Sequence, residues 1–159
     1  QSKHIGLLAT PATISSPYTR TLIQEHTNNI AVSLYSSVEL VTLAERLFFE
    51  QSLDTTKLHQ ELDRLNIDQS IDVLVLGCTH FPILAEPISQ YFNRKVQLLD
   101  SGAAIAKRVH YLISQLNLTN NNIADTKKPL QYYATASVSS RKLAVKLVTL
   151  IDPAQNEER

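Results

Sequence analysis

A nearly unbroken apolar run at residues 71–76, which ends abruptly at Gly77, constrains the fold of this chain most strongly. A strand that is apolar on both faces is typical of the centre of a parallel sheet covered by helices on each side. Cys78, the only cysteine, follows at once, and then come Thr79 and His80. Open α/β sheets bind ligands at the carboxyl ends of their strands, so these three side chains indicate an active-site edge.

Short apolar runs alternate with amphipathic stretches along the rest of the chain. The pattern predicts strands at residues 4–9, 30–35, 71–76, 96–99 and 130–138. It predicts helices that begin near Ser16, Ser36 or Ser37, Asp54, Pro82, Ser101, and Ser139 or Ser140. Residues 117–128 are polar and predict a loop. This alternation favours an α/β fold of three layers, with a parallel sheet between helices.

The helix expected at residues 36–51 carries its apolar residues at helical spacing. We expect its inner face to consist of Val38, Val41, Ala44, Leu47 and Phe48. The helix that begins at Asp54 is expected to turn Leu58, Leu62 and Leu65 inward.

The composition argues against several classes of function. Fifteen basic and fifteen acidic residues cancel, and no basic run predicts a nucleic-acid partner. The three glycines form no phosphate-binding loop and the five histidines have no metal-ligand spacing, so we expect neither cofactor nor metal. No apolar run approaches the roughly 20 residues of a membrane span. A single cysteine fits a reducing compartment, and we expect a cytoplasmic protein.

Cys78 is the leading candidate for chemistry. A helix amino terminus or a nearby cation would favour its thiolate, which can act as a nucleophile or accept a proton. The alternative is an inert cysteine of the core, because free cysteine is among the most buried residue types. His80 either orients or protonates a substrate group or caps the next helix. Thr79 either binds substrate or serves only as a capping hydroxyl.

Two more segments reach the same predicted edge. Thr10 and Thr13 follow the first strand, where two hydroxyls with free amides ahead of a helix can hold a carboxylate. The alternative for this loop is an ordinary turn. Glu45 lies on the helix expected at 36–51, either as a solvated carboxylate or as a partner whose charge favours a protonated His80.

The motif at residues 75–84, Val-Leu-Gly-Cys-Thr-His-Phe-Pro-Ile-Leu, resembles the second cysteine motif of the glutamate racemase family. Residues 5–13 are similar to the threonine-bearing loop that opens the family's second half. Residues 37–45 are similar to its acidic helix, and residues 98–106 to the segment that returns toward its first half. The resemblance extends from about His4 to Arg108 and more weakly to Ile151.

The resemblance implies a cofactor-independent racemase that interconverts L- and D-glutamate and supplies D-glutamate for peptidoglycan synthesis. It implies that Cys78 is one of two bases that act on opposite faces of the α-carbon. It also implies that Thr79 and His80 contact the substrate and that Glu45 assists the histidine. Thr10 and Thr13 match side chains at the family's substrate site.

The family's other cysteine lies in a first half that has no counterpart here. We therefore expect a carboxyl-terminal portion, inactive alone, whose partner is the missing first-half domain. Residues 1–95 are expected to form the second-half domain, residues 96–152 a return segment that packs on the first half, and residues 153–159 a tail. Without that partner the return segment would expose apolar stripes unless it repacks or forms a homodimer.

Other functions fit the same residues. A racemase for aspartate or another amino acid would share the outline of the motif, and a cysteine hydrolase would use the thiol as a nucleophile. A non-catalytic binding or folding module would leave the thiol inert.

Overall fold

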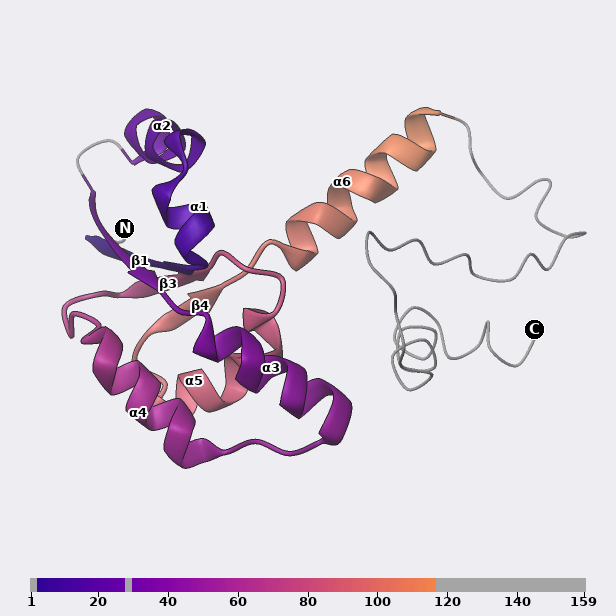
Figure 1. Cartoon of the computed structure of the whole chain (residues 1–159). Coiled ribbons are helices and arrows are strands. Elements are labelled where there is room, and N and C mark those ends of the chain that lie inside the picture. The colour runs from indigo at the N-terminus through magenta and orange to yellow at the C-terminus, as the bar shows by residue number, and fades with distance from the viewer. Residues whose placement is uncertain (1–2, 28–29, 117–159) are drawn as a thin grey trace, which may run out of the picture. The chain divides into compact units, whose positions relative to one another are not determined.

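A parallel sheet of four strands forms the centre of the computed structural model, which describes residues 3–27 and 30–116 (Figure 1). The strands are β1 (His4–Ala9), β2 (Ala31–Ser36), β3 (Val73–Leu76) and β4 (Gln97–Leu99), in the order β2-β1-β3-β4. Every neighbouring pair is parallel, which confirms the first four predicted strands and their direction. The loop, fifth strand and last helix expected after residue 116 lie outside the described residues.

Helices cover both faces of this sheet, so the predicted α/β class with three layers is confirmed. Helices α1 (Pro11–Ser15) and α2 (Pro17–His26) lie on one side (Figure 1). The other side carries α3 (Glu39–Glu50), α4 (Thr55–Leu65), the 3-10 helix η1 (Phe81–Leu84) and α5 (Ala85–Tyr91). Helix α6 (Gly102–Gln115) follows β4.

The hydrophobic core lies between the sheet and the layer of α3, α4, η1 and α5. Leu74 of β3 is fully buried because the strand has a neighbour on each side and helices above it. The other fully or almost fully buried apolar side chains are Leu8, Ala9, Leu40, Leu43, Ala44, Leu58, Leu62, Phe81, Leu84 and Ile88. The inner face of the helix capped by Asp54 is as predicted, with Leu65 packed at its margin.

Several helices begin where their capping residues predict. Asp54 is the N-cap of α4 and accepts a hydrogen bond from the Lys57 amide at 3.0 Å. Ser16 precedes Pro17 at the start of α2, although its side chain makes no capping bond. Ser37 caps the first turn of α3 by accepting a hydrogen bond from the Leu40 amide at 3.0 Å.

Two local expectations differ from the structure. The loop expected at residues 10–13 is the start of α1, for which Thr10 is the N-cap and Pro11 occupies the first turn. The helix expected to begin near Pro82 is a 3-10 turn followed by α5 from Ala85. Pro87 lies in the first turn of α5, where its missing N–H removes no hydrogen bond.

The inner face of α3 also differs from the prediction. Its buried residues are Leu40, Leu43 and Ala44, whereas Val38 is 63% exposed. Because the helix begins at Glu39, Val38 precedes the first turn and does not face the sheet. Val41 and Leu47 pack at the margin of the core, so the predicted face is rotated rather than reversed.

Residues 1–106 form one compact unit, and the chain from Lys107 onward belongs to a second. The first unit contains β4, which pairs with β3. The assignment of residues 96–152 to a segment that packs on another domain remains a prediction. Within the described ranges, no helix has the length and apolar character needed to cross a membrane.

Candidate active site

The site lies where β3 ends, and Gly77 is needed there for space. Its amide donates a hydrogen bond to the Leu8 carbonyl at 2.8 Å, which continues the pairing of β3 with β1. A Cβ atom at this position would lie 2.9 Å from Leu7 Cδ1 and 3.2 Å from Ala9 Cβ. The glycine therefore lets β1 pass close to the point where the chain turns into Cys78.

Three side chains from two elements meet just beyond Gly77. The Cys78 Sγ atom lies 3.7 Å from His80 Nδ1, within hydrogen-bonding reach for sulfur. The other ring nitrogen, His80 Nε2, lies 3.6 Å from Glu45 Oε1. The structure thus brings together the predicted thiol, imidazole and carboxylate, in that order.

This order defines a direction for proton transfer. A neutral imidazole that carries its proton on Nε2, toward Glu45, leaves the Nδ1 lone pair free to accept the thiol proton of Cys78. Such a transfer yields a thiolate and an imidazolium that lies beside the Glu45 carboxylate. The 3.6 Å separation is too long for a hydrogen bond, so the contact is an ion pair only when the ring is protonated.

Buried neighbouring residues fix the backbone positions of His80 and Glu45. His80 is the residue before η1, and the next side chain, Phe81, is fully buried. Glu45 follows Ala44, which is also fully buried, and α3 packs against η1. The His80 and Glu45 side chains are 38% and 56% exposed, so the core fixes their backbones while their polar ends reach solvent. His80 occupies the N-cap position of η1, although its side chain makes no capping hydrogen bond.

The predicted threonines form a separate pair at the same edge. Leu8 pairs with Leu76, so Thr10 and Cys78 both lie two residues past paired positions. Thr10 Oγ1 lies 3.0 Å from Thr13 Oγ1 and accepts the Thr13 amide at 3.4 Å. The Thr13 amide is therefore already bonded, contrary to the expectation of free amides. In the described part of the chain, no hydrogen bond joins either threonine to Cys78, His80 or Glu45.

Thr79 is exposed, and its hydroxyl has no hydrogen-bond partner among the described residues. It can therefore turn toward a ligand without breaking an existing bond. The same part of the chain contains no group of three His, Cys, Asp or Glu side chains that could hold a metal ion.

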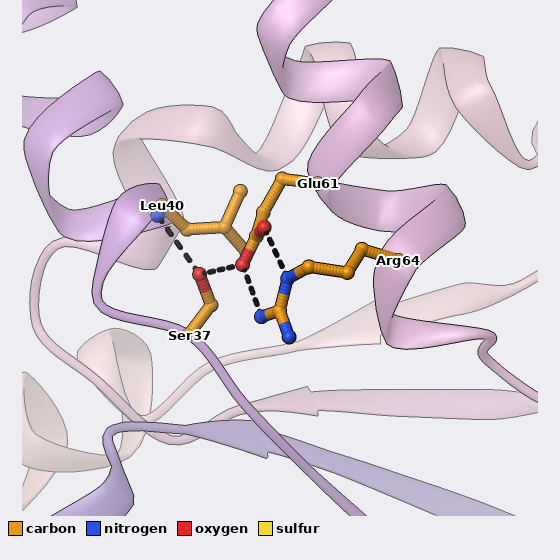
Figure 2. Close-up of polar contacts among 4 residues, drawn as sticks. All are labelled: Ser37, Leu40, Glu61 and Arg64. Carbon is orange, nitrogen blue, oxygen red and sulfur yellow. Dashed lines mark hydrogen bonds and ion pairs between the residues drawn. The ribbon is translucent and has the colours of Figure 1, made fainter.

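The sequence analysis missed one polar cluster, in which a buried glutamate of α4 is hydrogen-bonded to Ser37 and Arg64 (Figure 2). Glu61 of α4 is 8% exposed, forms two hydrogen bonds with Arg64 at 2.7 Å, and accepts the Ser37 hydroxyl at 2.5 Å. The hydrogen bonds from Arg64, assisted by that of Ser37, hold the pKa of Glu61 below its ordinary value despite burial. A signal existed, because Glu61 lies three residues after Leu58 and four before Leu65, on the face expected to turn inward.

Comparison with known proteins places this geometry in a family. The model of the Asp/Glu/hydantoin racemase family matches residues 1–109, and the chain belongs to that family. The glutamate racemase of Shewanella pealeana is 44% identical over 139 residues, a match that covers 87% of this chain and 52% of the relative. That of Shewanella woodyi is 51% identical over 120 residues, covering 76% of this chain and 45% of the relative.

Solved structures give the same result. The Escherichia coli glutamate racemase, in complex with L-glutamate and the activator UDP-MurNAc-ala, is 37% identical with a TM-score of 0.66. The match covers 70% of this chain and 42% of that one. The Francisella tularensis enzyme in complex with D-glutamate is 29% identical with a TM-score of 0.60, covering 75% and 44%. The resemblance to glutamate racemases is confirmed, and the chain spans about half the length of the curated relatives it matches.

Proposed function

We propose that this chain is the acid–base half of a glutamate racemase and that Cys78 serves one face of the substrate. The observation that carries the proposal is the contact chain from Cys78 Sγ through His80 to Glu45 at the carboxyl end of β3. A thiol beside an imidazole that is itself paired with a carboxylate is suited to proton transfer near neutral pH. The glutamate racemases to which the chain is similar supply the reaction class.

Inversion of an amino acid requires two bases, because the proton must leave one face of the α-carbon and arrive on the other. In one direction the Cys78 thiolate takes the α-proton, which breaks the carbon–hydrogen bond and leaves its electron pair on the α-carbon. A second acid then delivers a proton to the opposite face. In the other direction the Cys78 thiol donates the proton. Cys78 is the only cysteine of this chain, so a second thiol must come from outside it.

The remaining site residues are assigned to substrate binding and to support of the base. His80 accepts the thiol proton before the reaction and holds it beside Glu45. Thr79 and the pair Thr10 and Thr13 offer hydroxyls to the carboxylate and ammonium groups of glutamate. The partner is a first-half domain that closes the opposite side of the site, and no cofactor takes part.

The test joins this chain to the first half of the Shewanella pealeana racemase, because the two are 44% identical over their matching region. The 159-residue chain alone is expected to form no D-glutamate, and the joined protein is expected to convert L-glutamate. Turnover by the separate chain, abolished by Cys78→Ala, would contradict the need for a second half. If the joined protein converts neither glutamate nor aspartate, the proposal is wrong.

In the joined protein, Cys78→Ser is expected to lower racemisation roughly 10²- to 10⁴-fold, the range for loss of one acid–base group. The cause is that a hydroxyl is a far weaker acid than a thiol and supplies no anion near neutral pH. Rates are measured in both directions by circular dichroism of glutamate. Near-normal rates in both directions would remove Cys78 from the mechanism.

Aspartate is the alternative substrate, because the matching family includes aspartate racemases by its description. Turnover of L-aspartate in preference to L-glutamate by the same joined protein would select it. A non-catalytic module would instead show slow alkylation of Cys78 that glutamate does not change.

A further inference from the structure

Ser37 and Glu61 are buried and hydrogen-bonded to each other, and Arg64, whose side chain is exposed, binds the same carboxylate (Figure 2). Ser37 is only 2% exposed and comes immediately after β2. Its amide donates to the carbonyl of Ala9, the last residue of β1, at 3.2 Å. One buried serine therefore links the end of β1, the start of α3 and the middle of α4.

The carboxylate of Glu61 sets the direction of the hydrogen bonds in this cluster. An ionised carboxylate can only accept, so the single proton of the Ser37 hydroxyl must point to Glu61. A lone pair of the same hydroxyl is then left facing the Leu40 amide, which donates to it at 3.0 Å. Arg64 occupies both oxygens of Glu61 and keeps the carboxylate charged.

The amino-terminal end of α3 is held by polar contacts rather than by apolar packing. Val38 and Glu39 are both exposed, so apolar packing of the helix begins only at Leu40. The approach of the chain from β2 into α3 therefore depends on the bonds of Ser37. Five residues after Leu40 the same helix carries Glu45, whose carboxylate faces His80 across 3.6 Å.

We propose that Glu61 is a positioning residue for the site: through Ser37 it fixes the start of α3 and thereby the placement of Glu45 against His80. It touches neither Cys78 nor His80 and acts only through the helix. The inference rests on the proposed function for its catalytic meaning. The effect of Glu61 on the reactivity of the Cys78 thiol can be measured without racemase turnover.

The experiment follows alkylation of Cys78 by iodoacetamide in the full 159-residue chain at one fixed pH. Because Cys78 is the only cysteine, the second-order rate reports its thiolate directly. Glu61→Leu removes the acceptor, whereas Glu61→Gln keeps a side-chain oxygen that can accept from Ser37. Glu86→Gln is the matched control, since Glu86 of α5 forms an exposed ion pair with Arg94.

Glu61→Leu is expected to slow alkylation roughly two- to fivefold, the size expected for loss of a half-exposed ion pair. Glu61→Gln restores most of the rate, and Glu86→Gln leaves it unchanged. Glu45→Gln slows alkylation by a similar factor. The double variant of Glu45→Gln with Glu61→Leu is no slower than Glu45→Gln alone, because both changes remove the same interaction.

Circular dichroism of each variant shows whether it is folded, so that slower alkylation of a folded variant can be assigned to a change in positioning. Should Glu61→Leu fail to fold, Ser37→Ala removes the same hydrogen bond with a smaller change, and the same slowing is expected. Alkylation of folded Glu61→Leu or Ser37→Ala at the wild-type rate would overturn the proposal, as would full additivity with Glu45→Gln. A failed racemase assay leaves this readout intact, so the two proposals fail separately.

Discussion

Cys78 is a candidate acid–base residue because of the side chains around it, not because it is a cysteine. A lone cysteine is most often inert, but here one imidazole nitrogen lies 3.7 Å from its sulfur and the other lies 3.6 Å from a carboxylate. The sequence places Cys78 and His80 two positions apart, and this spacing suggested the pair. For Glu45, more than thirty residues earlier, the residues alone left a solvated carboxylate as the alternative, and only the family resemblance implied that it assists the histidine.

At the residue scale, Glu61 also predicts a pH dependence of stability. Its pKa in the folded chain lies below the ordinary value of 4.5, so the unfolded chain binds the proton more readily. The stabilisation is therefore complete above about pH 5 and is lost as the pH falls through the folded pKa, below 4.5. We expect Glu61→Gln to cost roughly 1–3 kcal/mol at pH 7, the range for a hydrogen bond to a charged group.

The measurement is urea unfolding of wild type and Glu61→Gln between pH 7 and pH 3. The difference between the two should shrink as the pH falls below about 4.5. Asp68, Asp72 and Glu86 also have lowered pKa values, through hydrogen bonds from Ser70, from the Lys3 amide, and from Gln90 and Arg94 respectively. They act equally in both proteins, so only the difference reports Glu61. A constant difference across this range would contradict the assignment.

At the scale of elements, caps and prolines decide where each helix begins. Asp54 and Ser37 sit where their sequence patterns predict, because a side-chain oxygen before a helical run satisfies an otherwise unpaired amide. The error at Thr10 has the same cause. A threonine followed by proline is a good helix start, and the segment folds as a five-residue helix rather than as a loop.

Removal of the cap at the start of α4 gives a prediction at this scale. Asp54→Ala leaves the Lys57 amide without its side-chain acceptor and is expected to destabilise the chain by about 1 kcal/mol. Asp54→Asn is the matched control and should lie within a few tenths of wild type, because asparagine caps about as well as aspartate. Equal losses in the two variants, measured by urea unfolding at pH 7, would show that charge rather than capping matters.

At the scale of the whole molecule, the core that the described residues form lies in the first unit. Every buried apolar residue among those described lies between Leu8 and Val96. Helix α6, by contrast, has exposed apolar side chains, among them Ile105, Val109 and Leu112. A partner domain would cover such a stripe, in line with a chain that spans about half the length of its relatives.

Because residues 8–96 bury a core among themselves, we predict that the sheet domain folds without residues 117–159. A chain that ends at Leu116 is expected to unfold cooperatively, with a Tm within a few degrees of that of the full chain. Thermal unfolding followed by far-ultraviolet circular dichroism provides the test. A large fall in Tm, or a loss of cooperativity, would mean that the later residues complete the core.

The amino-acid sequence by itself determined the strand order along the chain, the parallel α/β class and the edge that carries Cys78, Thr79 and His80. These depend on local patterns: an apolar run, a glycine at its end and capping residues at fixed offsets. The tertiary structure decided which distant groups meet. Only folding brings Glu45 to His80 and Ser37 to Glu61, because such contacts depend on how helices pack over the sheet. Helical spacing places Glu61 on the inward face, but only the folded chain shows the partners that hold its carboxylate there.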